Sequence, residues 1–160
     1  MLDTLWHLRG SLPLPPSLSD AEALDQVEGF LAAECKQVLG READRLAFRS
    51  DMFRGERNAV LAFFNSGEFQ ITARSAAGER MLDYDLSARY GFLACVVFAM
   101  FAAGIGAIGD GLRGALIGAA LALAWIYGMN RLTASIRVPH ALSKVVLRGH
   151  EEWNDACQKP

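Results

Sequence analysis

Two long apolar runs dominate the second half of the chain, Tyr90 to Gly109 and Gly114 to Met129. They are separated by the short polar turn Asp110-Gly111-Leu112-Arg113. Neither run contains a charged residue, and each is close to the length that a helix needs to cross a bilayer, about 17 to 25 residues. This pattern predicts a two-helix transmembrane hairpin.

An amphipathic helix is predicted to begin at Ser19. Ser19 and Glu22 have the spacing of a capping box, in which both side chains bind free backbone N–H groups of the first turn. Apolar residues then recur at helical spacing up to Gly40, which favours a helix end. The apolar positions of this helix are Leu24, Val27, Leu31, Cys35 and Val38.

Beyond this helix, apolar and polar residues alternate, which is typical of half-buried strands. The alternating segments are 46–49, 69–74 and 81–86, and Ala59 to Phe64 is apolar on both faces. Turn-forming residues occur at 54–56, 65–67 and 77–79. The sequence therefore predicts an antiparallel sheet of about four strands.

After the second apolar run, alternation at 132–138 predicts a fifth strand that rejoins the sheet, and Pro139 suits the start of a closing helix. The expected fold class is an α+β membrane protein, in which a small antiparallel sheet with flanking helices is interrupted by the hairpin. The expected parts are an N-terminal segment with a proline-rich spacer (1–18), a cytoplasmic α+β domain (19–88), the hairpin (89–131) and a strand and helix that return to the domain (132–160).

Small residues form rows along both apolar runs, and such rows let membrane helices approach closely. Gly114 and Gly118 form a G-x-x-x-G pair. Two uses stay open: packing of the two spans within one chain, or contact with other membrane helices or further copies of this chain. The predicted helix-packing residues are Ala99, Ala102, Ala103, Gly106, Gly114, Gly118 and Ala122.

The charge pattern predicts the location and disfavours one class of partner. A net charge of −2 and the lack of a basic stripe argue against nucleic-acid binding. The odd number of cysteines, 3, fits a reducing compartment, and the N-terminus has no signal-peptide pattern. Lys and Arg lie mainly outside the hairpin turn, which predicts an inner-membrane protein with two spans and both termini in the cytoplasm.

No catalytic, cofactor or metal site is predicted. Gly104, Gly106 and Gly109 match the dinucleotide motif G-x-G-x-x-G, but they follow a run of membrane length and lack the acidic residue that holds a ribose. The histidines have no metal-ligand spacing. Asp83 and Asp85 share one strand face and are read as solvated residues.

Two functional hypotheses of different classes remain. The first is a non-catalytic accessory or scaffolding subunit of a larger membrane complex, with membrane lipid and other membrane helices as partners. The second is a sensor-effector whose cytoplasmic domain binds an unidentified small molecule and clusters the hairpins. A membrane-tethered enzyme ranks last, because clustered polar residues are missing from the pattern.

Overall fold

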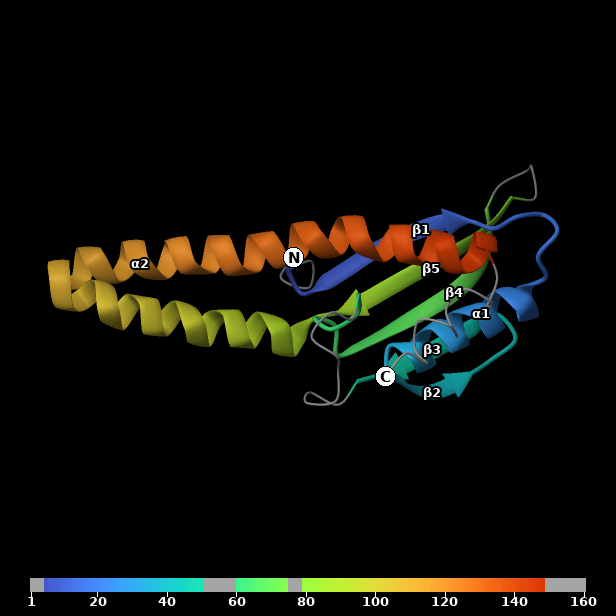
Figure 1. Ribbon diagram of the computed structural model, residues 1–160, viewed down its shortest axis with the longest axis horizontal. Helices are drawn as coiled ribbons and strands as arrows, with labels where there is room; N and C mark the ends of the chain where they lie inside the picture. Colours follow the sequence, from blue (N-terminus) through green and yellow to red (C-terminus); the bar gives the residue numbers. More distant parts are fainter. Residues whose placement is uncertain (1–4, 51–59, 75–78, 149–160) are drawn as a thin grey trace, which may run out of the picture.

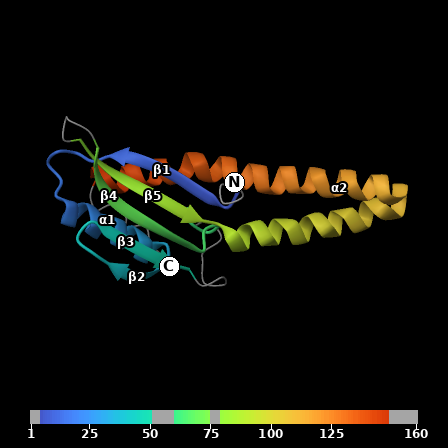
Figure 2. The ribbon, with the colours of Figure 1, turned by 180° about the vertical axis from the view of Figure 1, so that it is seen from behind.

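The computed structural model describes residues 5–50, 60–74 and 79–148. Its strands form one antiparallel sheet in the order β1-β5-β4-β3-β2. Figures 1 and 2 show α1 and the C-terminal part of α2 on one face of this sheet, while the described elements leave the other face open. The elements are β1 (His7–Pro13), α1 (Asp20–Ala33), β2 (Gln37–Arg41), β3 (Arg45–Arg49), β4 (Ser66–Arg74), β5 (Glu79–Ser87) and α2 (Arg89–Arg148).

The core lies between the sheet and the two helices. The apolar stripe of α1 points into it, and the inward side chains of β3, β4 and β5 meet that stripe. The largest fully buried side chains include Leu24, Phe30, Leu31, Leu46, Phe48, Phe69, Leu82, Leu86, Val138 and Leu142. Burying a side chain of this kind contributes about 1.5 to 3 kcal/mol, so this layer provides most of the stability of the domain.

Helix α1 starts as predicted and ends early. The capping box is present, with Ser19 N donating to the Glu22 carboxylate over 2.8 Å. The helix ends at Ala33 rather than at Gly40, because Cys35 adopts a positive φ of 54° and turns the chain into β2. Val38, expected on the helix, therefore lies in a strand.

The sheet differs from the predicted one at three places. Strands β3, β4 and β5 correspond to the alternating segments, whereas β1 and β2 were not predicted. Residues 60–63 form a turn instead of a strand, because the buried Glu34 carboxylate accepts hydrogen bonds from the N–H groups of Val60 (3.1 Å) and Leu61 (2.8 Å). Ala59, the first residue of that predicted strand, lies outside the described residues.

The predicted fifth strand at 132–138 and the helix start at Pro139 are wrong, because α2 is helical through both. Ala134, Val138 and Leu142 are buried at intervals of four residues, while Leu132 and Ile136 are exposed. Spacings of four fit a helix face as well as a strand face. The apolar pattern was therefore ambiguous, and packing on the core decides it.

The predicted pair of separate transmembrane helices is also wrong. The helical structure after β5 is one element, and Arg89–Val146 is the single described helix that is long and apolar enough to cross a membrane. Within this element, the backbone leaves helical angles at Asp110 and Gly111 of the polar turn. The two-span topology with both termini in the cytoplasm required two such helices and is not supported.

Helix α2 folds back on itself at Asp110 and Gly111, where Gly111 takes a positive φ of 59° that glycine adopts without strain. Figure 1 shows the resulting N-terminal arm (residues 89–109) and C-terminal arm (residues 112–148) side by side. Residues 93–129 extend beyond the sheet and are called the projection, and its junction with the sheet is called the root.

Candidate functional site

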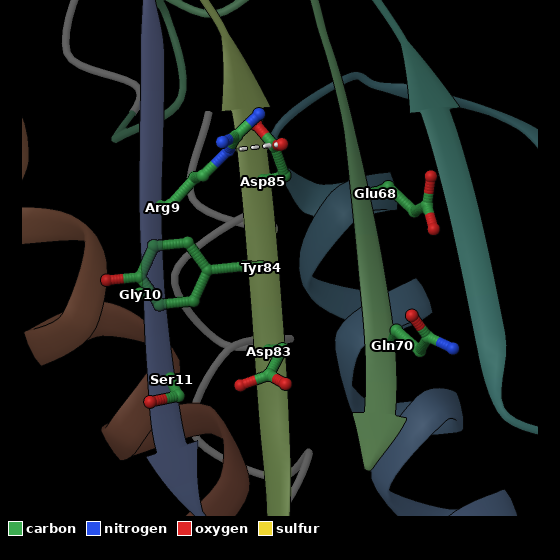
Figure 3. A pocket seen from close by; sticks show the side chains of 8 residues that line it. All are labelled: Arg9, Gly10, Ser11, Glu68, Gln70, Asp83, Tyr84 and Asp85. Carbon is green, nitrogen blue, oxygen red and sulfur yellow. Dashed lines mark hydrogen bonds and ion pairs between the residues drawn. The ribbon is translucent and has the colours of Figure 1, made fainter. Parts of the chain in front are cut away.

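The open face of the sheet carries polar side chains in rows that cross the strands. The pairing register aligns Arg49, Ser66, Ser87 and His7 in the row nearest the root. The next row holds Ala47, Glu68, Asp85 and Arg9, and the third holds Arg45, Gln70, Asp83 and Ser11. Figure 3 shows three side chains of the second row (Glu68, Asp85 and Arg9) and three of the third (Gln70, Asp83 and Ser11) on neighbouring strands.

Most charges in the second and third rows are paired. Asp85 accepts hydrogen bonds from His7 and from Arg9 Nε, the latter over 2.7 Å. Partial burial raises the pKa of Asp85, but these two hydrogen bonds outweigh that effect and hold the pKa below its usual value. Arg45 binds Glu68 in the same way, with 2.6 Å between Arg45 Nη2 and Glu68 Oε2.

A shallow cleft of about 460 Å³ lies over these rows. Its carboxylates already have cationic or hydroxyl partners, including the 2.8 Å hydrogen bond from Thr72 Oγ1 to Asp83 Oδ2. Within the described ranges, no group of three His, Cys, Asp or Glu side chains could hold a metal ion. Asp83 and Asp85 thus lie on the open face, and their arrangement favours a charged surface over acid–base chemistry.

Tyr84 belongs to the opposite face and fixes β1 against β5. Its ring lies across Gly10, where a Cβ atom would overlap the ring (Figure 3). Burial raises the pKa of the Tyr84 hydroxyl. The glycine therefore lets an aromatic ring cover the edge strand from the core side.

A second cleft, of about 530 Å³, lies at the root and differs in charge. We call it the root cleft; its lining residues are His7, Arg49, Asn65, Ser66, Ser87, Arg89 and Tyr90. Four of these residues form the first row of the open face, and Arg89 and Tyr90 begin α2. The cleft therefore joins the open face to the first turn of the projecting helix.

The polar groups of the root cleft are only partly satisfied. Within the described part of the chain, neither Arg49 nor Arg89 forms an ion pair or a side-chain hydrogen bond. Ser87 is 7% exposed, and its hydroxyl oxygen has no hydrogen-bond partner there. Asn65 Oδ1 accepts from the backbone N–H of Tyr90 over 3.4 Å, which caps the first turn of α2.

Aromatic and basic side chains surround the root. The Trp6 ring lies 6.1 Å from the ring of Phe92, and Phe92 lies 5.4 Å from Tyr127 on the other arm. Arg131 donates to the carbonyl oxygens of His7 (2.9 Å) and Leu5 (3.2 Å), which ties the C-terminal arm to the start of β1. The apolar segment around Trp6 therefore packs at the root.

Some of the predicted helix-packing residues lie in close contact between the two arms. Gly106 and Gly114 approach so closely that a Cβ atom on either would overlap the carbonyl oxygen of the other. A Cβ atom on Gly118 would lie 2.8 Å from the carbonyl oxygen of Ala102. Ala99 is buried, and Ala102, Ala103 and Ala122 are half-buried. Contact of these helices with other chains stays a prediction.

Sequence reasoning missed the root cleft. Ser66 was seen only as a turn residue, and Arg49, Ser87 and Arg89 carried no motif. The residues come from β1, β3, β4, β5 and α2, so only the strand register brings them together. The alternation of polar residues was the available signal. It predicts which face of the sheet a residue occupies, but not which residues of other strands lie beside it.

Comparisons with protein-family models, with curated proteins and with solved structures give no match for this chain.

Proposed function

We propose that this protein is a non-catalytic membrane protein in which the projection of α2 lies in lipid and holds the sheet domain at the membrane surface. In this role it is an accessory or scaffolding subunit, and the open sheet face is presented to partners outside the bilayer. The observation that carries the proposal is the outward surface of the projection.

That surface is apolar along both arms, outside the fold-back. Large apolar side chains point away from the contact between the arms, and Ile108 is 88% exposed. Soluble monomers rarely expose contiguous apolar patches larger than a few hundred Å². The exposed apolar side chains of the projection are Leu93, Val97, Phe98, Met100, Phe101, Ile105, Ile108, Leu112, Leu116, Ile117, Leu121, Trp125 and Met129.

The free energy gained by transferring these side chains from water to lipid is large. Removing a mostly exposed Leu, Ile or Phe side chain from water contributes roughly 1 kcal/mol or more. Over the side chains named above, the sum is on the order of 10 kcal/mol, which is comparable to the total stability of a domain. A water-exposed projection would therefore drive aggregation, whereas lipid would stabilise it.

The distribution of charge supports the same proposal. Between Arg89 and Arg131, the charged residues are Asp110 and Arg113, both at the fold-back. A helix rises 1.5 Å per residue, so the charge-free stretch from Tyr90 to Gly109 is about 30 Å long. This length is close to the thickness of the hydrocarbon core. The aromatic residues at the root suit the boundary between lipid and water.

The test is to fractionate cells that make the full chain and to wash the membranes with alkaline carbonate. We expect the protein to stay in the membrane pellet and to require detergent for release. A matched variant with Ile105, Ile108 and Leu116 changed to Gln should leave the pellet, because uncompensated polar groups are costly in lipid. Recovery of the unaltered protein in the soluble fraction would refute the proposal.

The accessory role needs a second measurement, the mass of the detergent-purified protein and of whatever co-purifies with it. Stoichiometric membrane subunits would support the accessory role, and a homo-oligomer would favour clustering of this chain instead.

A further inference from the structure

We propose that the root cleft binds a phosphate group, supplied by the headgroup of an anionic phospholipid. The inference deepens the proposed function, since it depends on the projection lying in lipid. It is carried by three features of the cleft: two guanidinium groups and a buried hydroxyl that have no partner among the described residues, and a position at the base of the projection.

Two guanidinium groups, those of Arg49 and Arg89, supply positive charge for binding an anion in the cleft. Arg9 and Arg45, on the same sheet face, have carboxylate partners at 2.6 to 2.7 Å. Within the described residues, Arg49 and Arg89 have no such partner, although both line the cleft. Guanidinium groups bind phosphate oxygens through paired, charge-assisted hydrogen bonds, so this pair fits a phosphate better than a neutral ligand.

Ser87 provides an independent sign of a ligand. Ser87 lines the cleft and is only 7% exposed, and its hydroxyl has no hydrogen-bond partner among the described residues. Leaving such a group unsatisfied destabilises the fold, and such groups in native proteins call for an explanation such as a bound ligand. A phosphate oxygen in the cleft would accept a hydrogen bond from this hydroxyl.

The Asp85 carboxylate, in the neighbouring row of the open face, does not oppose an anion at this site. Asp85 lies two residues before Ser87 on the same face of β5, and its charge is paired with the guanidinium group of Arg9. The first turn of α2 adds the partial positive charge of a helix N-terminus. The positive charges around the cleft therefore favour the binding of an anion.

The position of the cleft selects a lipid as the source of the phosphate. Arg89 and Tyr90 line the cleft, and the exposed apolar surface of the projection starts a few residues later at Leu93. A phospholipid whose acyl chains lie along the N-terminal arm would bring its phosphate to the level of Arg89. Free phosphate would gain the same polar contacts but none of the apolar ones.

The test uses the full chain, washed free of lipid in a neutral detergent and titrated with phosphatidylglycerol or phosphatidylcholine. Native mass spectrometry counts the lipid bound to each chain. We expect one phosphatidylglycerol per chain, at least tenfold tighter than phosphatidylcholine. Arg49→Gln and Arg89→Gln should each weaken the phosphatidylglycerol affinity about tenfold, the usual effect of losing a charge-assisted hydrogen bond.

The matched control is Arg45→Gln, which removes the same charge from the same strand but outside the cleft. Its phosphatidylglycerol affinity should equal that of the unaltered chain. An equal loss in Arg45→Gln, or equal affinity for the two lipids, would overturn the proposal. Tighter binding of inorganic phosphate than of phosphatidylglycerol would overturn the lipid source.

Ser87→Ala separates binding from folding. The variant should bind phosphatidylglycerol several-fold more weakly, while its unfolding temperature without lipid stays equal or rises, because an unsatisfied hydroxyl is removed. Unchanged affinity would overturn the role of Ser87 and with it the proposal. Carbonate resistance of the same variants is scored in parallel: if it persists while lipid selectivity is absent, the headgroup site fails and the proposed membrane role stands.

Discussion

The contact between the two arms of α2 gives a sharp test of the fold, through a single methyl group. Gly106 faces the backbone of Gly114, whereas Gly104, two residues earlier on the same arm, has nothing within 4 Å of the position of its missing Cβ. The variants Gly106→Ala and Gly104→Ala therefore make the same chemical change on the two sides of one helix.

The magnitude follows from two opposing effects. Replacing glycine by alanine inside a helix stabilises it by about 0.5 to 1 kcal/mol, and this gain applies to both variants. At Gly106 the methyl group would overlap the Gly114 carbonyl oxygen, and overpacking of this kind typically costs about 1 to 3 kcal/mol. The two variants should thus differ by about 1 to 3 kcal/mol, with Gly104→Ala the more stable.

The assay is thermal unfolding of the full chain in one mild detergent, followed by circular dichroism. For a chain of this size, 1 kcal/mol corresponds to about 2 to 4 °C, so Gly106→Ala should unfold roughly 2 to 12 °C below Gly104→Ala. Gly118→Ala should fall between them, because its Cβ would lie 2.8 Å from the Ala102 oxygen. Equal unfolding temperatures for Gly104→Ala and Gly106→Ala would refute the close contact of the arms.

Three further variants test the sheet domain. Ser19→Ala removes the capping box of α1 and should cost about 1 kcal/mol in urea unfolding; a change within error would show that the cap contributes nothing. Arg80→Met leaves the carbonyl oxygen of Pro15 and the Asp20 carboxylate without their partner and should cost about 1 to 3 kcal/mol, with Arg80→Lys in between. The pKa of Asp85 is lower in the folded protein than the value of about 3.9 in the unfolded chain. The ionised carboxylate therefore stabilises the fold above the unfolded pKa, and this contribution is lost as the pH falls through the folded pKa. Asp85→Asn should therefore be less stable at neutral pH and equal to the unaltered chain in acid, and a stability difference that does not change with pH would contradict this.

A local sequence pattern was sufficient to predict an element where the pattern is compatible with only one kind of structure. Leu82, Tyr84 and Leu86 alternate with polar residues and form one buried strand face. Ser19 and Glu22 satisfy each other, so the start of α1 depends on four adjacent residues alone. Such elements could be predicted because neither needs a distant partner.

The sequence pattern failed where a helix and a strand share the same apolar spacing. It also failed where the local conformation depends on a residue distant in the sequence. Ala134 and Val138 are four residues apart, which fits both periods, and only their packing on the core selects the helix. The turn at 60–63 depends on Glu34, more than 25 residues away in the chain. The root cleft needs the register of four strands, which no local pattern contains.

The inward stripe of α2 changes in size along its length, and this change matches the two partners that the helix packs against. In the projection the stripe is built from glycine and alanine, so the backbones of the two arms touch, as in the close packing of membrane helices. Past the root the same stripe becomes Val138, Leu142 and Val145, which fill the wider gap between a helix and a sheet. Arg131 lies between the two regimes and binds the start of β1. Arg131 therefore fixes the root against the sheet, and the proposed burial of the projection in lipid would bring the headgroups to the row of Arg49, Ser66, Ser87 and His7.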